Sequence, residues 1–121
     1  MAYTFCKGMN KEKMRSILAE HLVKFRALSY DDLAREIDRT DREHDCLAHF
    51  EGVAQDGTPY QIELNVFWDD QPKGNIRVAG DISLEPQKRL LGSVPVFQPN
   101  LNDGFIMAPD GSFIGQNANT G

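Results

Sequence analysis

The sequence predicts an α+β domain in which two N-terminal helices pack on one face of an antiparallel meander of four or five strands. Apolar residues recur every three or four positions in the first third of the chain, whereas from Cys46 onward they recur at every second position. A length of 121 residues suits one domain. We expect residues 1–9 to be a mobile leader, residues 10–115 to form the domain and residues 116–121 to be a frayed tail.

Two helices are predicted before the sheet. The first spans Asn10–Arg26, because its apolar residues follow a helical spacing. These residues are Met14, Ile17, Leu18, Leu22 and Phe25. His21 lies on the same side, and we interpret it as a boundary histidine with satisfied hydrogen bonds. The second helix spans Ser29–Ile37, with Ser29 capping its first turn. The charged stretch Arg39–Asp45 is expected to be irregular.

Strict alternation of apolar and polar residues predicts the sheet. Strands over Tyr60–Trp68 and Asn75–Ile82 carry apolar residues at even positions, so the even positions are expected to face the helices. These two strands form a hairpin that pairs Trp68 with Ile76. A further strand precedes them at about Cys46–Ala54.

The C-terminal part has weaker patterns. Pro95 removes a ladder donor from Ser93–Phe97, which is therefore an edge strand or no strand. A loop is expected at Gln98–Gly104. A turn with proline and glycine then separates Phe105–Ala108 from Ser112–Ile114, which predicts a small terminal hairpin.

The turn after the first strand decides which face its charged residues take. A two-residue turn would send His49 and Glu51 into the core. A three-residue loop with left-handed Gly57 pairs Ala54 with Thr58 and turns both side chains to solvent. Burying an unpaired carboxylate is costly, so we predict the second register. The residues expected to face the helices are then Cys46, Ala48 and Phe50.

The negative charge is concentrated in the sheet. The chain has 13 basic and 18 acidic residues and a net charge of −5. Residues 1–45 hold nine of each sign, so residues 46–121 carry the whole excess, and the range 46–72 has no Lys or Arg. An acidic chain cannot gain binding energy by releasing counterions from a nucleic-acid backbone, so no nucleic-acid partner is expected. A negative field on the sheet instead favours encounter with a basic protein.

No membrane partner, cofactor or metal is expected. No apolar run approaches the roughly 20 residues that span a bilayer. The start of the chain lacks the features of an export signal, so the expected location is the cytoplasm. Cys6 and Cys46 have no spacing typical of a zinc or redox site.

Our leading hypothesis is a non-enzymatic protein-interaction module that presents an acidic outer sheet face to a basic protein. The residues predicted to bind the partner are Glu51, Glu63, Asp69, Asp70 and Asp81. A toxin-neutralising immunity protein is one version of this hypothesis, by analogy with acidic domains that occlude a basic nuclease site. A homodimer joined through a sheet edge near Val94–Phe97 is another possibility.

The alternative is a small metal-dependent or acid/base hydrolase. In the predicted registers Glu63 lies between His49 and Asp81 across three neighbouring strands. A histidine with two carboxylates could share a proton or bind a divalent cation. We favour the simpler interpretation of a hydrated surface cluster balanced by Arg77.

Three segments, Tyr60–Asp70, Gly74–Val78 and Phe105–Gly115, resemble a family of short, uncharacterised bacterial proteins. Members share a YQ-E-VFWDD-P-G--RV core and an F(I/V)-APDGSF(V/I)G ending. The resemblance covers about Asn10–Gly115, and the chain departs from the pattern between Ile82 and Phe105. It implies a common fold and no reaction.

Overall fold

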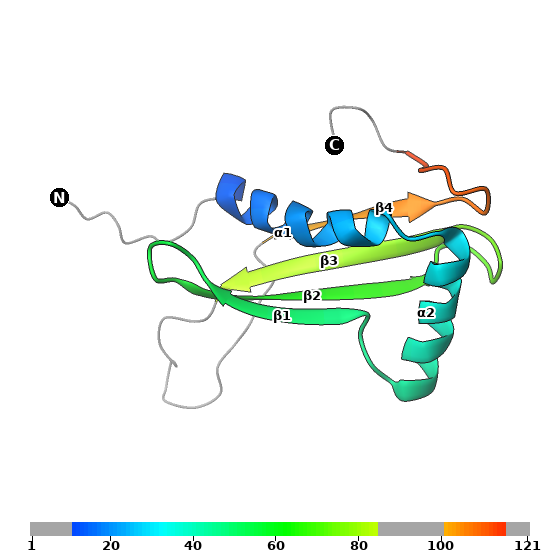
Figure 1. The fold of residues 1–121 in the computed structure, drawn as a ribbon, viewed down its shortest axis with the longest axis horizontal. Coiled ribbons are helices and arrows are strands. Elements are labelled where there is room, and N and C mark those ends of the chain that lie inside the picture. The colour runs from blue at the N-terminus through cyan, green and yellow to red at the C-terminus, as the bar shows by residue number, and fades with distance from the viewer. Residues whose placement is uncertain (1–10, 85–100, 116–121) are drawn as a thin grey trace.

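The structure, a computed structural model, describes residues 11–84 and 101–115. Helices α1 (Lys11–Arg26) and α2 (Tyr30–Glu43) precede an antiparallel sheet, whose four described strands have the order β1-β2-β3-β4. The strands are β1 (Ala48–Val53), β2 (Pro59–Trp68), β3 (Ile76–Leu84) and β4 (Leu101–Met107). Figure 1 shows both helices on one side of the sheet, α1 along β3 and β4 and α2 across the end of β2. The α+β class is therefore confirmed.

The turn between β1 and β2 has the three-residue form that the sequence predicts. The Ala54 N–H donates to the Thr58 carbonyl at 2.8 Å, and Gly57 has a φ of 91°. A positive φ at this position suits glycine, which has no Cβ to strain. The resulting register leaves His49 and Glu51 exposed to solvent.

The hairpin of β2 and β3 also has its predicted register, with Trp68 opposite Ile76 and Glu63 opposite Asp81. Even positions of both strands therefore face the helices. Together with residues of α1, α2 and β4 they form one apolar core. Its buried members are Met14, Leu18, Leu22, Leu33, Ile37, Leu47, Ile62, Leu64, Val66, Ile76, Val78, Ile82, Phe105 and Met107.

Helix α1 packs tightly against the sheet at Gly80. A Cβ built there would lie 2.6 Å from Leu64 Cδ2 and 3.1 Å from Leu18 Cδ1. Glycine on the inner face of β3 thus makes room for the apolar side chains that join the helix to the sheet. Leu18 and Leu64 are both fully buried as a result.

Helix α2 is longer than predicted, since it ends at Glu43 and includes most of the stretch expected to be irregular. Arg39 stabilises this part of the helix: its guanidinium donates to Glu36 at 2.8 Å and to Glu43 at 3.2 Å. Thr40 is buried and continues the inward-facing stripe of the helix. The helix stops at His44, which adopts the left-handed conformation with a φ of 54°.

The start of β1 differs from the predicted alternation. Leu47 is buried, while Cys46, Ala48 and Phe50 are only half-buried. The Leu47 N–H donates to the carbonyl of Leu64, although the Cα partner of Leu64 is Ala48. Two consecutive residues thus share one position of β2, and the period of two breaks there.

The C-terminal strand is longer than predicted and is followed by the small terminal hairpin that the sequence predicts. Strand β4 includes Leu101–Gly104, which the sequence suggests is loop, because these residues pair with Ala79–Ile82 of β3. The terminal hairpin contains a single bridge between Met107 and Phe113. The possible edge strand at Ser93–Phe97, the leader and the tail lie outside the described residues.

Replacing Leu18 by alanine should lower the free energy of unfolding by about 2–5 kcal/mol, because a fully buried side chain would leave a cavity between α1 and Gly80. Denaturant unfolding followed by circular dichroism measures the change. Val23→Ala is the matched control on the same helix, since Val23 is 58% exposed. It should change the free energy by no more than about 0.5 kcal/mol. Equal effects of the two substitutions would contradict the assigned helix face.

Candidate functional site

The outer face of the sheet brings together the charged residues that alternation predicts for it. His49, Glu63 and Asp81 are aligned on β1, β2 and β3, and Glu51 lies in the next row opposite Gln61. We call the surface around Glu51, Glu63 and Asp81 the acidic face. It is not uniformly open to solvent, because Ser83, which follows Asp81 on the outer side of β3, is buried.

His49 does not join the two carboxylates in a hydrogen-bonded row. Its Nε2 lies 3.3 Å from the side-chain oxygen of Gln61, and Glu63 accepts from Asn65 Nδ2 at 3.2 Å. Among residues 11–84 and 101–115, no group of three or more His, Cys, Asp or Glu side chains could hold a metal ion. The structure therefore brings Glu63 and Asp81 together and turns the imidazole toward Gln61.

Asp81 is the most perturbed carboxyl of the acidic face. Partial burial raises its pKa above the ordinary value of 3.8, and the neighbouring Glu63 carboxylate raises it further. The two carboxylates therefore repel each other, and no basic side chain of the described residues forms an ion pair with either of them.

The predicted aspartates after β2 lie at the other end of the sheet. Asp69 is not free, because its carboxylate accepts from Arg77 Nε at 2.8 Å. Arg77 is opposite Phe67 in the register and balances Asp69, not Glu63 or Asp81. Asp70 is exposed in the connection to β3. The five predicted partner-binding residues therefore form two separate groups.

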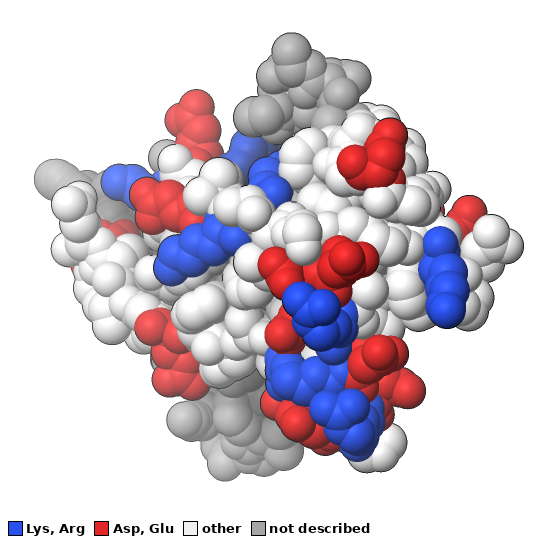
Figure 2. Space-filling model, turned by 45° about the vertical axis from the view of Figure 1, so that its right-hand side comes forward, with Lys and Arg blue, Asp and Glu red and all other residues white. Residues whose placement is uncertain are grey.

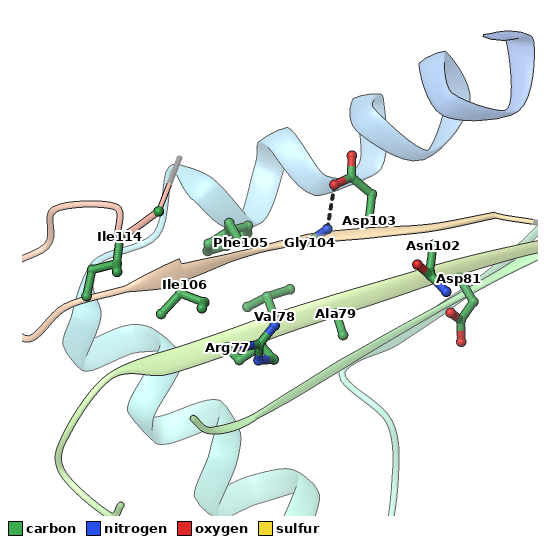
Figure 3. A pocket seen from close by; sticks show the side chains of 11 residues that line it. Arg77, Val78, Ala79, Asp81, Asn102, Asp103, Gly104, Phe105, Ile106 and Ile114 are labelled. Atoms are coloured by element: carbon green, nitrogen blue, oxygen red, sulfur yellow. Dashed lines mark hydrogen bonds between the residues drawn. The ribbon is translucent and has the colours of Figure 1, made fainter. Parts of the chain in front are cut away.

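A hollow of about 520 Å³ lies beside the acidic face, over β3 and β4. Two of its lining residues, Ala79 and Gly104, are opposite each other in the register. Any Cβ at Gly104 would collide with the carbonyl of Val78, so only glycine fits there. Figure 3 shows Asp81 and Asn102 side by side at one end of the hollow.

The rest of the hollow combines apolar and charged groups. Ile106 and Ile114 border it, and Arg77 lies at the end opposite Asp81 (Figure 3). Asp103 also borders the hollow, and its carboxylate accepts the N–H of Gly104 at 2.8 Å (Figure 3). The hollow is partly open to solvent, so it suits a side chain of another molecule better than an enclosed small ligand.

Sequence reasoning missed a second acidic surface on α2. This helix carries six acidic and three basic residues, whereas α1 carries five basic and two acidic ones. The net charge of residues 1–45 is zero because the basic excess of α1 offsets the acidic excess of α2. Figure 2 shows α2 with acidic and basic side chains crowded on its exposed surface. The spacing of Asp38 and Asp41 could have revealed it, but the range 39–45 was expected to be irregular.

His21 differs from the satisfied boundary histidine that we predicted. Its Nδ1 is buried and has no hydrogen-bond partner among the described residues. The ring instead packs on Phe50, with centroids 4.2 Å apart. Burial lowers the pKa of His21, and the charge of Lys24 lowers it further. The side chain thus acts as a neutral, largely apolar cover for the edge of the core.

Comparison with known proteins found no matching family model, no matching curated protein and no matching solved structure. Within the described residues, no helix is long and apolar enough to cross a membrane. What the molecule binds must therefore be inferred from the chemistry of its own surface.

Replacing Asp81 by asparagine should stabilise the protein at neutral pH. The raised pKa means that the folded state binds the proton more tightly than the unfolded chain, so the wild type loses stability as pH rises from about 3.8 through the folded pKa. Asp81→Asn removes this loss. Its melting temperature should exceed that of the wild type near pH 7, and the difference should shrink toward pH 3.

Glu51→Gln serves as the control, since it removes a carboxyl from the same face but faces Gln61 instead of another carboxylate. A smaller change in the pH dependence of the melting temperature is expected. If both variants behave alike, the partial burial of Asp81 and its repulsion with Glu63 are not the cause.

Proposed function

We propose that the protein is a non-enzymatic interaction module that binds a basic protein through the acidic face. The observation that carries this proposal is the pair of neighbouring carboxylates, Glu63 and Asp81, which has no cation of the described chain opposite it. A lysine or arginine of a partner would compensate both charges.

Other groups around the pair support a protein partner. The hollow next to Asp81 offers space for a side chain, with Ile106 and Ile114 as apolar contacts. Val53 on the outer side of β1 is 67% exposed and adds apolar surface at the margin. Apolar contacts with charged groups around them are typical of protein interfaces.

Glu51, Asp69 and Asp70, the other predicted partner-binding residues, contribute unequally to the proposed binding surface. Glu51 extends the acidic face by one row, and Asp70 supplies a further exposed carboxylate at the end of β2. Asp69 is neutralised by Arg77 and adds little net charge. A toxin-neutralising immunity protein of the cytoplasm is a concrete form of the proposal, since an acidic module can occlude a basic nuclease site.

Charge reversal of the pair, in the double variant Glu63→Lys and Asp81→Lys, should weaken binding to an immobilised oligolysine peptide. The variant should bind more slowly and show a flatter dependence of the association rate on salt, because electrostatic steering is lost. Surface plasmon resonance across a salt series measures both quantities.

The matched control is Glu12→Lys with Glu20→Lys, which makes the same change in net charge on the exposed side of α1. It should keep most of the steering toward the peptide. An equal loss in both double variants would show that only net charge matters, and the proposal would be wrong.

One observation favours a second candidate, an acid/base hydrolase. Partial burial raises the pKa of Asp81 and the neighbouring Glu63 raises it further, and a carboxyl pair in which one member keeps its proton can act as acid and base. This candidate predicts turnover of nitrophenyl ester or glycoside substrates, with a loss of about 100-fold or more in Asp81→Asn. Assays with and without a chelator test the metal-dependent form. Absence of turnover in the wild type under both conditions would exclude it.

A further inference from the structure

A groove of about 420 Å³ lies between α2 and the end of β2. The ladder between β1 and β2 ends at the pair Ala48 and Leu64, whereas β2 continues to Trp68. The last turns of α2 therefore face the end of β2, which is not paired with β1. The lining residues are Ile37, Asp38, Thr40, Asp41, Val66, Phe67 and Trp68.

The rim of this groove has two carboxylates that the described chain leaves uncompensated. Asp38 and Asp41 are exposed and lie one helical turn apart. Neither forms an ion pair within the described residues, although Arg42 is on the same helix. Arg39 and Arg35 are bound to other acids of α2 and do not neutralise them.

Two aromatic residues at the end of β2, Phe67 and Trp68, also line the groove. Phe67 is at an outward position of β2, beyond the end of the ladder with β1, and is 43% exposed. Trp68 is half-buried and packs on Tyr30, with centroids 6.3 Å apart. Tyr30 donates to the carbonyl of Gly74 at 2.7 Å and so ties α2 to the connection between β2 and β3. The groove therefore has apolar and aromatic lining residues on β2 and two carboxylates on α2.

We propose that the groove binds one arginine side chain of a basic protein partner, with the guanidinium between Asp38 and Asp41 and its flat face toward Phe67. A guanidinium can bind two carboxylates and stack on a ring, while a lysine ammonium is a compact point charge that stays hydrated. The inference rests on the proposed function for the source of the arginine, but separate residues carry it.

Trp68, the single tryptophan of the chain, lines the groove and reports on its occupancy. The probe is a blocked glycine-rich peptide with one arginine, compared with the same peptide carrying lysine or uncharged citrulline. The arginine peptide should give a saturable change in Trp68 fluorescence, the lysine peptide should bind more weakly, and the citrulline peptide should not bind. Amide shifts in NMR spectra of the full chain should locate the site at Asp38, Asp41 and Phe67.

The test variant is Asp38→Asn with Asp41→Asn, which should weaken binding of the arginine peptide by about fivefold or more. Phe67→Leu should also weaken it, because stacking is lost while the apolar wall is kept. The control is Glu12→Gln with Glu20→Gln, which removes two helical carboxylates elsewhere and should leave the affinity unchanged. Equal binding by wild type and Asp38→Asn with Asp41→Asn, or an equal loss in the control, would overturn the inference.

Charge reversal at Glu63 and Asp81 separates this inference from the proposed function. Arginine-peptide binding should survive that variant, since neither residue lines the groove. If oligolysine binding depends on Glu63 and Asp81 but the arginine peptide gives no saturable signal, the groove inference fails alone. If the arginine peptide binds as expected while oligolysine is insensitive to the charge reversal, the acidic face fails alone.

Discussion

The left-handed backbone at Gly57 is the constraint on which the rest of the sheet depends. It sets the length of the turn between β1 and β2, and the turn sets which residues of the two strands are opposite each other. A shift by one residue would exchange the two faces of β1 and place Glu51 among the apolar residues beneath α1. Because an unpaired buried carboxylate is so costly, the turn and the alternation of the strands favour the same register.

The same arrangement leaves the outer surface and the rim of α2 as the surfaces on which the two proposed binding sites lie. On the inner side, Gly80 lets α1 settle against Leu64, and the apolar residues there are closed off from any partner. On the outer side, Glu63 and Asp81 share a repulsion that the free protein does not relieve within the described residues. Stability is thus lower than it would be with a neutral pair, and a cation from outside would recover the difference.

Local patterns in the sequence predicted the helices, the two central hairpins and the alignment of His49, Glu63 and Asp81. They missed features that depend on contacts between distant segments. The ion pairs of Arg39 extend α2 to Glu43, and the pairing with β3 makes a strand of Leu101–Gly104 despite its poor strand formers. The groove at Phe67 exists only because β1 begins at Ala48, opposite Leu64, and α2 is longer than expected, so no single stretch of sequence predicts it.

The hydrogen bond between Asp103 and Gly104 has a consequence for self-association. Strand β4 is the last strand of the described sheet, and a row of backbone donors along such a margin invites foreign chains to join by strand addition. The carboxylate of Asp103 occupies the donor of Gly104, and its charge faces any incoming backbone carbonyl. An incoming strand would have to displace this carboxylate before it could pair with the Gly104 N–H, so Asp103 disfavours strand addition at this position of β4.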